Sequence, residues 1–159
     1  MSPLLCLVNP AHILVVDDDP DLRMSIAEVL EEEGYEVSCA RNGEEALHAL
    51  DGDAPSAIIL DLTMPVMDGW TFRERQRCDP RLAGIPTVVI TASFSDAHAA
   101  ESLGAEAFLA KPFDIMRLTE TLQRVCGPAT DGPRPAASVA PTGPSPAPAA
   151  RAAGPRSRR

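Results

Sequence analysis

Short runs made almost entirely of apolar residues recur along the first 126 residues, and they constrain the fold more than any other feature. The runs "ILVV", "AIIL" and "TVVI" do not alternate apolar with polar side chains. A strand with one face in water does alternate, so these runs indicate strands covered on both faces. Helical patterns separate the runs, as crossover connections between parallel strands require. We expect strands at residues 13–16, 36–39, 57–60, 87–90 and 107–109, and helices at residues 22–30, 44–50, 70–77, 96–103 and 115–125.

Five strand–helix units in succession predict an α/β fold, with a five-stranded parallel sheet and helices on both faces. Residues that favour helix ends support these boundaries. Asn42 and Asp114 stand at N-cap positions, and Gly34 and Gly104 stand where two helices would close. Since aromatic residues make up only 4% of the chain, the core should consist of Val, Ile, Leu and Ala.

Composition divides the chain into three segments. From Gly127 onward the sequence is mostly Pro, Ala, Gly, Ser and Arg, which cannot bury enough apolar surface to offset chain entropy. We therefore expect an N-terminal extension at residues 1–11, one folded domain at residues 12–126, and a disordered tail at residues 127–159.

The charge of the chain is uneven and argues against several classes of partner. The formal net charge is −9, but five arginines and one acid follow Cys126, which leaves −13 on the preceding residues. An acidic body disfavours direct DNA binding, because neutralisation of DNA phosphates by Lys and Arg supplies much of the affinity. No apolar run approaches the roughly 18 residues of a membrane span, and the N-terminal residues lack the basic segment of an export signal. We expect a soluble, cytoplasmic protein with no membrane span.

Polar residues stand where four of the predicted strands end. Asp17 and Asp18 follow the first strand, Asp61 follows the third, Thr91 the fourth, and Lys111 comes shortly after the fifth. Ligands of doubly wound sheets bind beyond the carboxyl ends of the strands. If these strands are neighbours, the five side chains converge on one pocket.

The chemistry of that pocket suits a phosphoryl group. Clustered carboxylates repel one another unless a cation or protons neutralise them. Oxygen ligands without a dedicated cage favour Mg²⁺, whose coordination is commonly completed by water and phosphate oxygens. A lysine and a hydroxyl add positive charge and a hydrogen-bond donor, and phosphoryl transfer depends on such positioning and charge stabilisation.

The motifs "ILVVDDDP", "AIILDLTMPVMDGW", "VVITA" and "AFLAKPF", in this order, resemble the receiver domain of bacterial response regulators. The resemblance covers approximately residues 12–126. It implies a flavodoxin-like (CheY-like) sheet with strand order 2-1-3-4-5. It also implies a phosphorylatable switch of two-component phosphorelay signalling, not an enzyme that turns over a substrate.

The resemblance also implies roles for individual residues. Asp61 would accept a phosphoryl group from a phosphohistidine on a sensor histidine kinase or phosphotransfer protein. Asp18, Asp61 and the backbone carbonyl of Thr63 would bind Mg²⁺ directly, and Asp17 would bind it through water. Lys111, expected before a cis peptide bond to Pro112, would pair with a phosphoryl oxygen.

A second set of residues would form the switch and control its lifetime. The Thr91 hydroxyl would donate to the phosphoryl group, and Phe108 would turn inward as Thr91 moves. A plain core role remains an alternative for Phe108. The side chains of Thr63 and Ser93 stand at positions that would govern water access to the phosphorylated aspartate.

The output of such a switch stays open at the level of the sequence. Thr91 and Lys111 are 20 positions apart, about two fewer than expected for a receiver, an offset similar in size to the error of predicted boundaries. The fourth helix or its loop is therefore expected to be shortened, and the downstream protein is unknown. Two alternatives remain: a non-phosphorylated receiver acting as an interaction module, and a small phosphatase of the haloacid-dehalogenase type.

Overall fold

The computed structural model describes residues 10–127, except for the side chains of Phe94, Ala97 and Ala100. The predicted N-terminal extension and disordered tail lie outside the described residues, apart from residues 10, 11 and 127. Within residues 10–127, no helix is both long enough and apolar enough to cross a bilayer.

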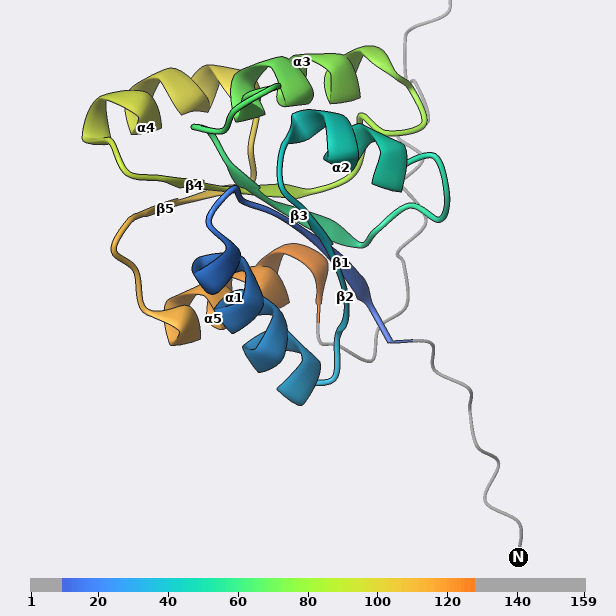
Figure 1. The fold of residues 1–159 in the computed structure, drawn as a ribbon, viewed down its shortest axis with the longest axis vertical. Helices are drawn as coiled ribbons and strands as arrows, with labels where there is room; N and C mark the ends of the chain where they lie inside the picture. The colour runs from blue at the N-terminus through green and yellow to red at the C-terminus, as the bar shows by residue number, and fades with distance from the viewer. Residues whose placement is uncertain (1–9, 128–159) are drawn as a thin grey trace, which may run out of the picture.

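The centre of the molecule is a parallel sheet of five strands. Along the chain they are β1 (His12–Val16), β2 (Glu36–Ala40), β3 (Ala57–Asp61), β4 (Thr87–Thr91) and β5 (Ala107–Ala110). Hydrogen-bonded neighbours follow the order β2-β1-β3-β4-β5 (Figure 1). This order confirms the predicted fold class, and it makes β1, β3 and β4 neighbours at the centre.

Helices cover both faces of the sheet. On one face lie α1 (Pro20–Glu32) and α5 (Ile115–Cys126), and on the other lie α2 (Gly43–Ala49), α3 (Gly69–Cys78) and α4 (Phe94–Ala100) (Figure 1). The helix predicted at residues 96–103 starts earlier and ends as a 3-10 turn, η1 (Glu101–Leu103). Such tightening of the last turn is common at helix ends.

The two helical layers explain the uninterrupted apolar runs. Along β1, Ile13 and Val15 pack into the cluster under α1 and α5, whereas Leu14 and Val16 pack into the cluster under α2 and α3. Every residue of β3 and β4 is buried, while the edge strands β2 and β5 are partly exposed. Because helices cover both faces of the central strands, the side chains on both faces are mostly apolar.

Side-chain caps mark the start of α2, α3 and α5. Asn42 and Asp114 cap α2 and α5 as predicted, and Asp68 caps α3, which was not predicted. Gly34 and Gly104 adopt φ values of 96° and 62°, in the left-handed region that favours glycine. The chain therefore enters and leaves the helices where its polar and glycine residues indicate.

Candidate functional site

Two adjacent strands bring three carboxylates together. Because β1 pairs with β3, Asp17 and Asp18 after β1 lie beside Asp61 at the end of β3. One carboxylate oxygen from each residue lies within 4.8 Å of the others. The acidic pocket defined by Asp17, Asp18 and Asp61 thus forms at the carboxyl edge of the sheet, where it was predicted.

Asp17 is fully buried and is held through both carboxylate oxygens. Its Oδ1 accepts a hydrogen bond from the Asp19 amide at 2.9 Å, and its Oδ2 accepts one from Lys111 Nζ at 3.0 Å. Its backbone carbonyl also accepts from the Arg23 guanidinium at 2.7 Å. These contacts fix the turn that presents Asp18 to the pocket.

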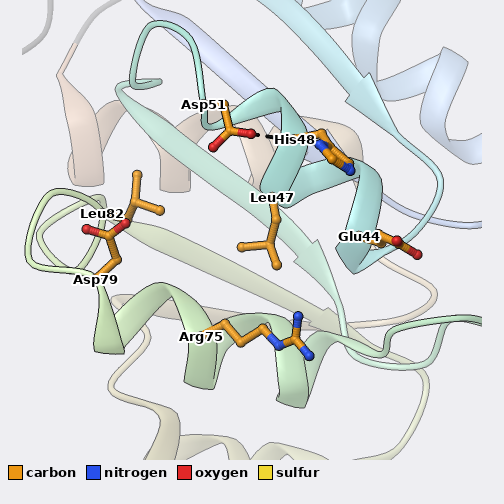
Figure 2. Close-up of a pocket in the computed structure, with 7 residues that line it drawn as sticks. All are labelled: Glu44, Leu47, His48, Asp51, Arg75, Asp79 and Leu82. Carbon is orange, nitrogen blue, oxygen red and sulfur yellow. Dashed lines mark ion pairs between the residues drawn. The ribbon is translucent and has the colours of Figure 1, made fainter.

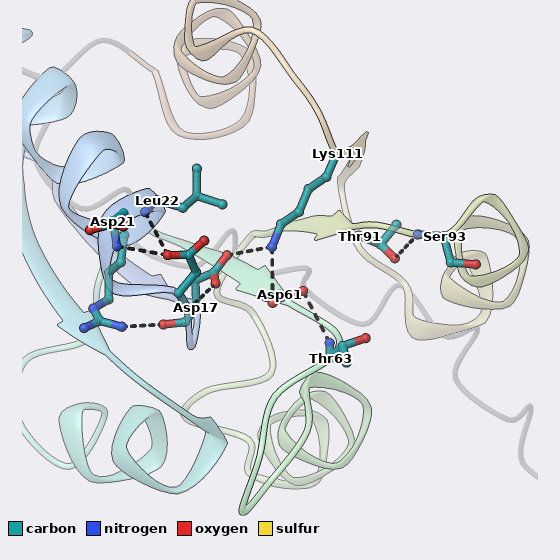
Figure 3. A network of polar contacts seen from close by, with 10 residues as sticks. Asp17, Asp21, Leu22, Asp61, Thr63, Thr91, Ser93 and Lys111 are labelled. Atoms are coloured by element: carbon teal, nitrogen blue, oxygen red, sulfur yellow. Dashed lines mark hydrogen bonds and ion pairs between the residues drawn. The ribbon is translucent and has the colours of Figure 1, made fainter.

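Lys111 joins two of the three acids. Figure 3 shows its ammonium between Asp17 and Asp61, with Nζ 3.3 Å from Asp61 Oδ2. Its backbone amide donates to the Thr91 carbonyl at 2.7 Å, and the Lys111–Pro112 peptide is cis, as expected. Burial lowers the pKa of Lys111, because it disfavours the charged ammonium. Hydrogen bonds and attraction to Asp17 and Asp61 outweigh this effect and raise the pKa of Lys111 above its ordinary value. The lysine therefore stays protonated in the pocket.

Asp61 is only 4% exposed. Burial, followed by repulsion from Asp17, raises the pKa of Asp61 to about 6, although Lys111 and the Thr63 amide act in the opposite direction. One lysine thus leaves the three carboxylates short of positive charge. A hard divalent cation would supply it, and the all-oxygen donor set fits Mg²⁺.

The remaining predicted residues lie around this network. The Thr63 amide donates to Asp61 Oδ1 at 3.3 Å, while its side chain is exposed. Thr91 is buried at the end of β4, and its hydroxyl accepts from the Ser93 amide at 3.2 Å, beside the Asp–Lys network and not within it (Figure 3). Phe108 on β5 is half-buried against a small apolar cluster.

Gly69 has a contact that the sequence did not reveal. Its amide donates to the Leu62 carbonyl at 3.0 Å. A Cβ atom on Gly69 would collide with the backbone oxygen of Asp61 and lie 2.8 Å from Leu62 Cα. Only glycine therefore allows α3 to begin directly against the loop that follows Asp61.

A separate cavity of about 300 Å³ lies between α2 and α3 (Figure 2). It contains none of the predicted site residues. The residues that line it are Glu44, Leu47, His48, Asp51, Arg75, Asp79 and Leu82.

Comparison with known proteins agrees with this geometry. The family model for the response regulator receiver domain matches residues 13–123. Response regulator Rre1 from Synechocystis is 37% identical over 111 residues, which are 68% of this chain and 48% of the relative. The chain therefore spans about half the length of that relative.

Solved structures of receiver domains show the same fold. Chemotaxis response regulator CheY4 of Vibrio cholerae is 34% identical with a TM-score of 0.68, covering 73% of this chain and 98% of its own. The receiver domain of sensor histidine kinase PA1611 from Pseudomonas aeruginosa has a magnesium ion coordinated in its active site cleft. It is 29% identical with a TM-score of 0.69, and the match covers 74% of this chain and 98% of the PA1611 receiver domain. Given the family match, the strand order and the acidic pocket, this chain belongs to the response regulator receiver domain family of two-component signalling.

Proposed function

We propose that Asp61 accepts a phosphoryl group from a phosphohistidine on a sensor histidine kinase or phosphotransfer protein. One observation carries the proposal. The nearly buried Asp61 carboxylate contacts Lys111 Nζ and lies beside the carboxylates of Asp17 and Asp18. This arrangement offers a nucleophilic oxygen, a fixed positive charge and ligands for a divalent cation at one point.

The proposed transfer is an in-line displacement. A carboxylate oxygen of Asp61 forms a bond to phosphorus as the phosphorus–nitrogen bond to the donor imidazole breaks. The imidazole nitrogen retains the electron pair of that bond and takes a proton from water. Lys111 pairs with one phosphoryl oxygen, and its protonated state supplies the charge for this role.

Four residues are assigned to the metal. Asp18, Asp61 and the Thr63 backbone carbonyl would hold Mg²⁺ directly, and Asp17 would hold it through water. Bound there, the ion supplies charge stabilisation for the phosphoryl oxygens. The fixed oxygens of Asp17 and Asp61 keep these ligands in place before the donor arrives.

The response to phosphorylation is assigned to Thr91 and Phe108. The Thr91 hydroxyl, which accepts from the Ser93 amide in the resting structure, turns toward the phosphoryl group, and Phe108 turns inward. The phosphorylated arrangement is selected from conformations already present in the ensemble. The domain, proposed to span residues 12–126, then signals by contact with a downstream protein and not by binding DNA directly, and attack by water resets it.

The test is the intact mass of the full chain after incubation with Mg²⁺ and acetyl phosphate. The wild-type chain should gain one acid-labile phosphoryl group, and Asp61→Asn should gain none. Asp53→Asn, a change of the same kind in an exposed loop, is the matched control and should still be phosphorylated.

Other outcomes would favour other functions. A chain that gains no adduct at any Mg²⁺ concentration would act as a non-phosphorylated interaction module. Repeated turnover of acetyl phosphate without retention of phosphorus on Asp61 would indicate a phosphatase.

A further inference from the structure

The short helix α4 and the turn η1 that follows it are held very differently at their two ends. Three successive carbonyls at the C-terminal end, those of Ser102, Leu103 and Gly104, accept hydrogen bonds from arginines of α3. The last carbonyls of a helix lack partners within the helix, so these arginines supply a C-terminal cap from another element.

Arg73 provides most of this cap. Its side chain is buried, with the residue 3% exposed. Its Nε donates to the Leu103 carbonyl at 3.1 Å and its Nη2 to the Gly104 carbonyl at 2.9 Å. Its Nη1 donates to Gln76 Oε1 at 2.8 Å and to Thr87 Oγ1 at 2.9 Å. A buried guanidinium with this many partners fixes the turn before β5 against both α3 and β4.

Two further contacts strengthen the same end. Arg77, one turn along α3, donates to the Ser102 carbonyl at 3.1 Å. Glu106 Oε2 accepts from the Thr87 amide at 3.0 Å, and the Glu106 amide donates to the Thr87 carbonyl at the same distance. The end of η1 and the start of β5 are therefore one braced unit.

The N-terminal end of α4 depends on the candidate switch instead. In the described part of the chain, the Ser93 side chain caps no amide of α4; its hydroxyl lies 2.6 Å from Ser95 Oγ. The Ser93 amide donates to Thr91 Oγ1. If Thr91 turns toward a phosphoryl group, this amide loses its acceptor, while the arginine bonds at the other end are unaffected.

We propose that the α4–η1 segment pivots about the end held by Arg73 and Arg77, so that phosphorylation displaces its Ser93 end and leaves the turn at Leu103–Gly104 in place. The inference rests on the proposed function, because phosphorylation of Asp61 supplies the stimulus. A helix of seven residues has little stability of its own. The arginine brace keeps this segment attached to the sheet while its other end moves, and the surface offered to a downstream protein changes chiefly at the start of α4.

Hydrogen exchange by mass spectrometry on the full chain tests the pivot. With Mg²⁺ and acetyl phosphate, peptides covering residues 92–98 should change their exchange rate several-fold, and peptides covering residues 101–106 should not. Intact mass from the same sample gives the phosphorylated fraction, so failure to phosphorylate is separated from failure of the pivot. Equal changes in both regions would overturn the inference.

Variants test the two ends separately, even without phosphorylation. Arg73→Met should speed exchange at the Gly104 and Glu106 amides by about tenfold or more, because bonds from a charged donor are lost. Arg77→Ala removes a single hydrogen bond, to the Ser102 carbonyl at the same end, and should speed exchange there by a smaller factor. It provides the test if Arg73→Met does not fold. Arg75→Ala, an exposed arginine of the same helix, is the control and should leave residues 101–106 unchanged.

Thr91→Val, which removes the acceptor of the Ser93 amide, should speed exchange at residues 92–98 alone. A response of residues 101–106 to Thr91→Val, or normal exchange there in both arginine variants, would refute the proposed brace.

Discussion

The substitution Asp61→Asn should alter the pH dependence of stability by an amount that the pocket itself sets. Burial and the Asp17 carboxylate raise the pKa of Asp61 from 3.8 to about 6. Because the folded state holds this proton more tightly than the unfolded chain, Asp61 contributes stability at low pH and loses it as the pH rises through about 6. At 1.36 kcal/mol per pKa unit, the loss is about 2 to 3 kcal/mol. The asparagine side chain of the variant would carry no such proton.

The free energy of unfolding of the Asp61→Asn variant should therefore rise relative to that of the wild type as the pH increases. Urea unfolding of both chains without divalent cations, at intervals from pH 4 to pH 8, should show the stability difference shifting toward the variant by about 2 to 3 kcal/mol. Most of the shift should occur below about pH 6. Thr63→Ser, which replaces one neutral side chain with another beside Asp61, should show a difference that is constant with pH. A constant difference for Asp61→Asn as well would refute the assignment of Asp61 as a desolvated carboxylate with a raised pKa.

Three further predictions follow from the geometry. Mg²⁺ at tenfold its dissociation constant should stabilise the wild-type chain by about 1.4 kcal/mol in thermal unfolding, and Asp18→Asn should reduce this gain, whereas K⁺ at equal ionic strength should not reproduce it. Gly69→Ala should destabilise the fold by about 2 kcal/mol in urea, because its methyl group meets the backbone of Asp61 and Leu62; a neutral effect would contradict the close approach. Val66 is 78% exposed with φ of 69°, so Val66→Asn should stabilise the chain by about 1 kcal/mol in the same assay, and a loss of stability would show that this backbone is not strained.

Local sequence signals predicted the elements well because few neighbours are needed to interpret them. The strands begin and end within about one residue of the predicted positions, since the interior of a strand buried on both faces is apolar. Asn42 and Asp114 cap their helices because their side chains bond amides only a few residues ahead. The sequence did not predict that the last turn of the fourth helix is the 3-10 turn η1, whose Leu103 carbonyl accepts from an arginine of another helix.

The sequence alone determined that this chain forms a parallel α/β sheet with Asp17, Asp18, Asp61, Thr91 and Lys111 at the carboxyl ends of its strands, because strand periodicity and chain order fix which residues stand there. Only the tertiary structure decided how these groups contact one another: Lys111 joins Asp17 to Asp61, while the Thr91 hydroxyl pairs with Ser93. The same holds for Arg73, whose partners 14 to 31 residues away turn an ordinary helical arginine into a buried brace. Contacts of this kind depend on packing between elements distant in the chain, and no local pattern encodes them.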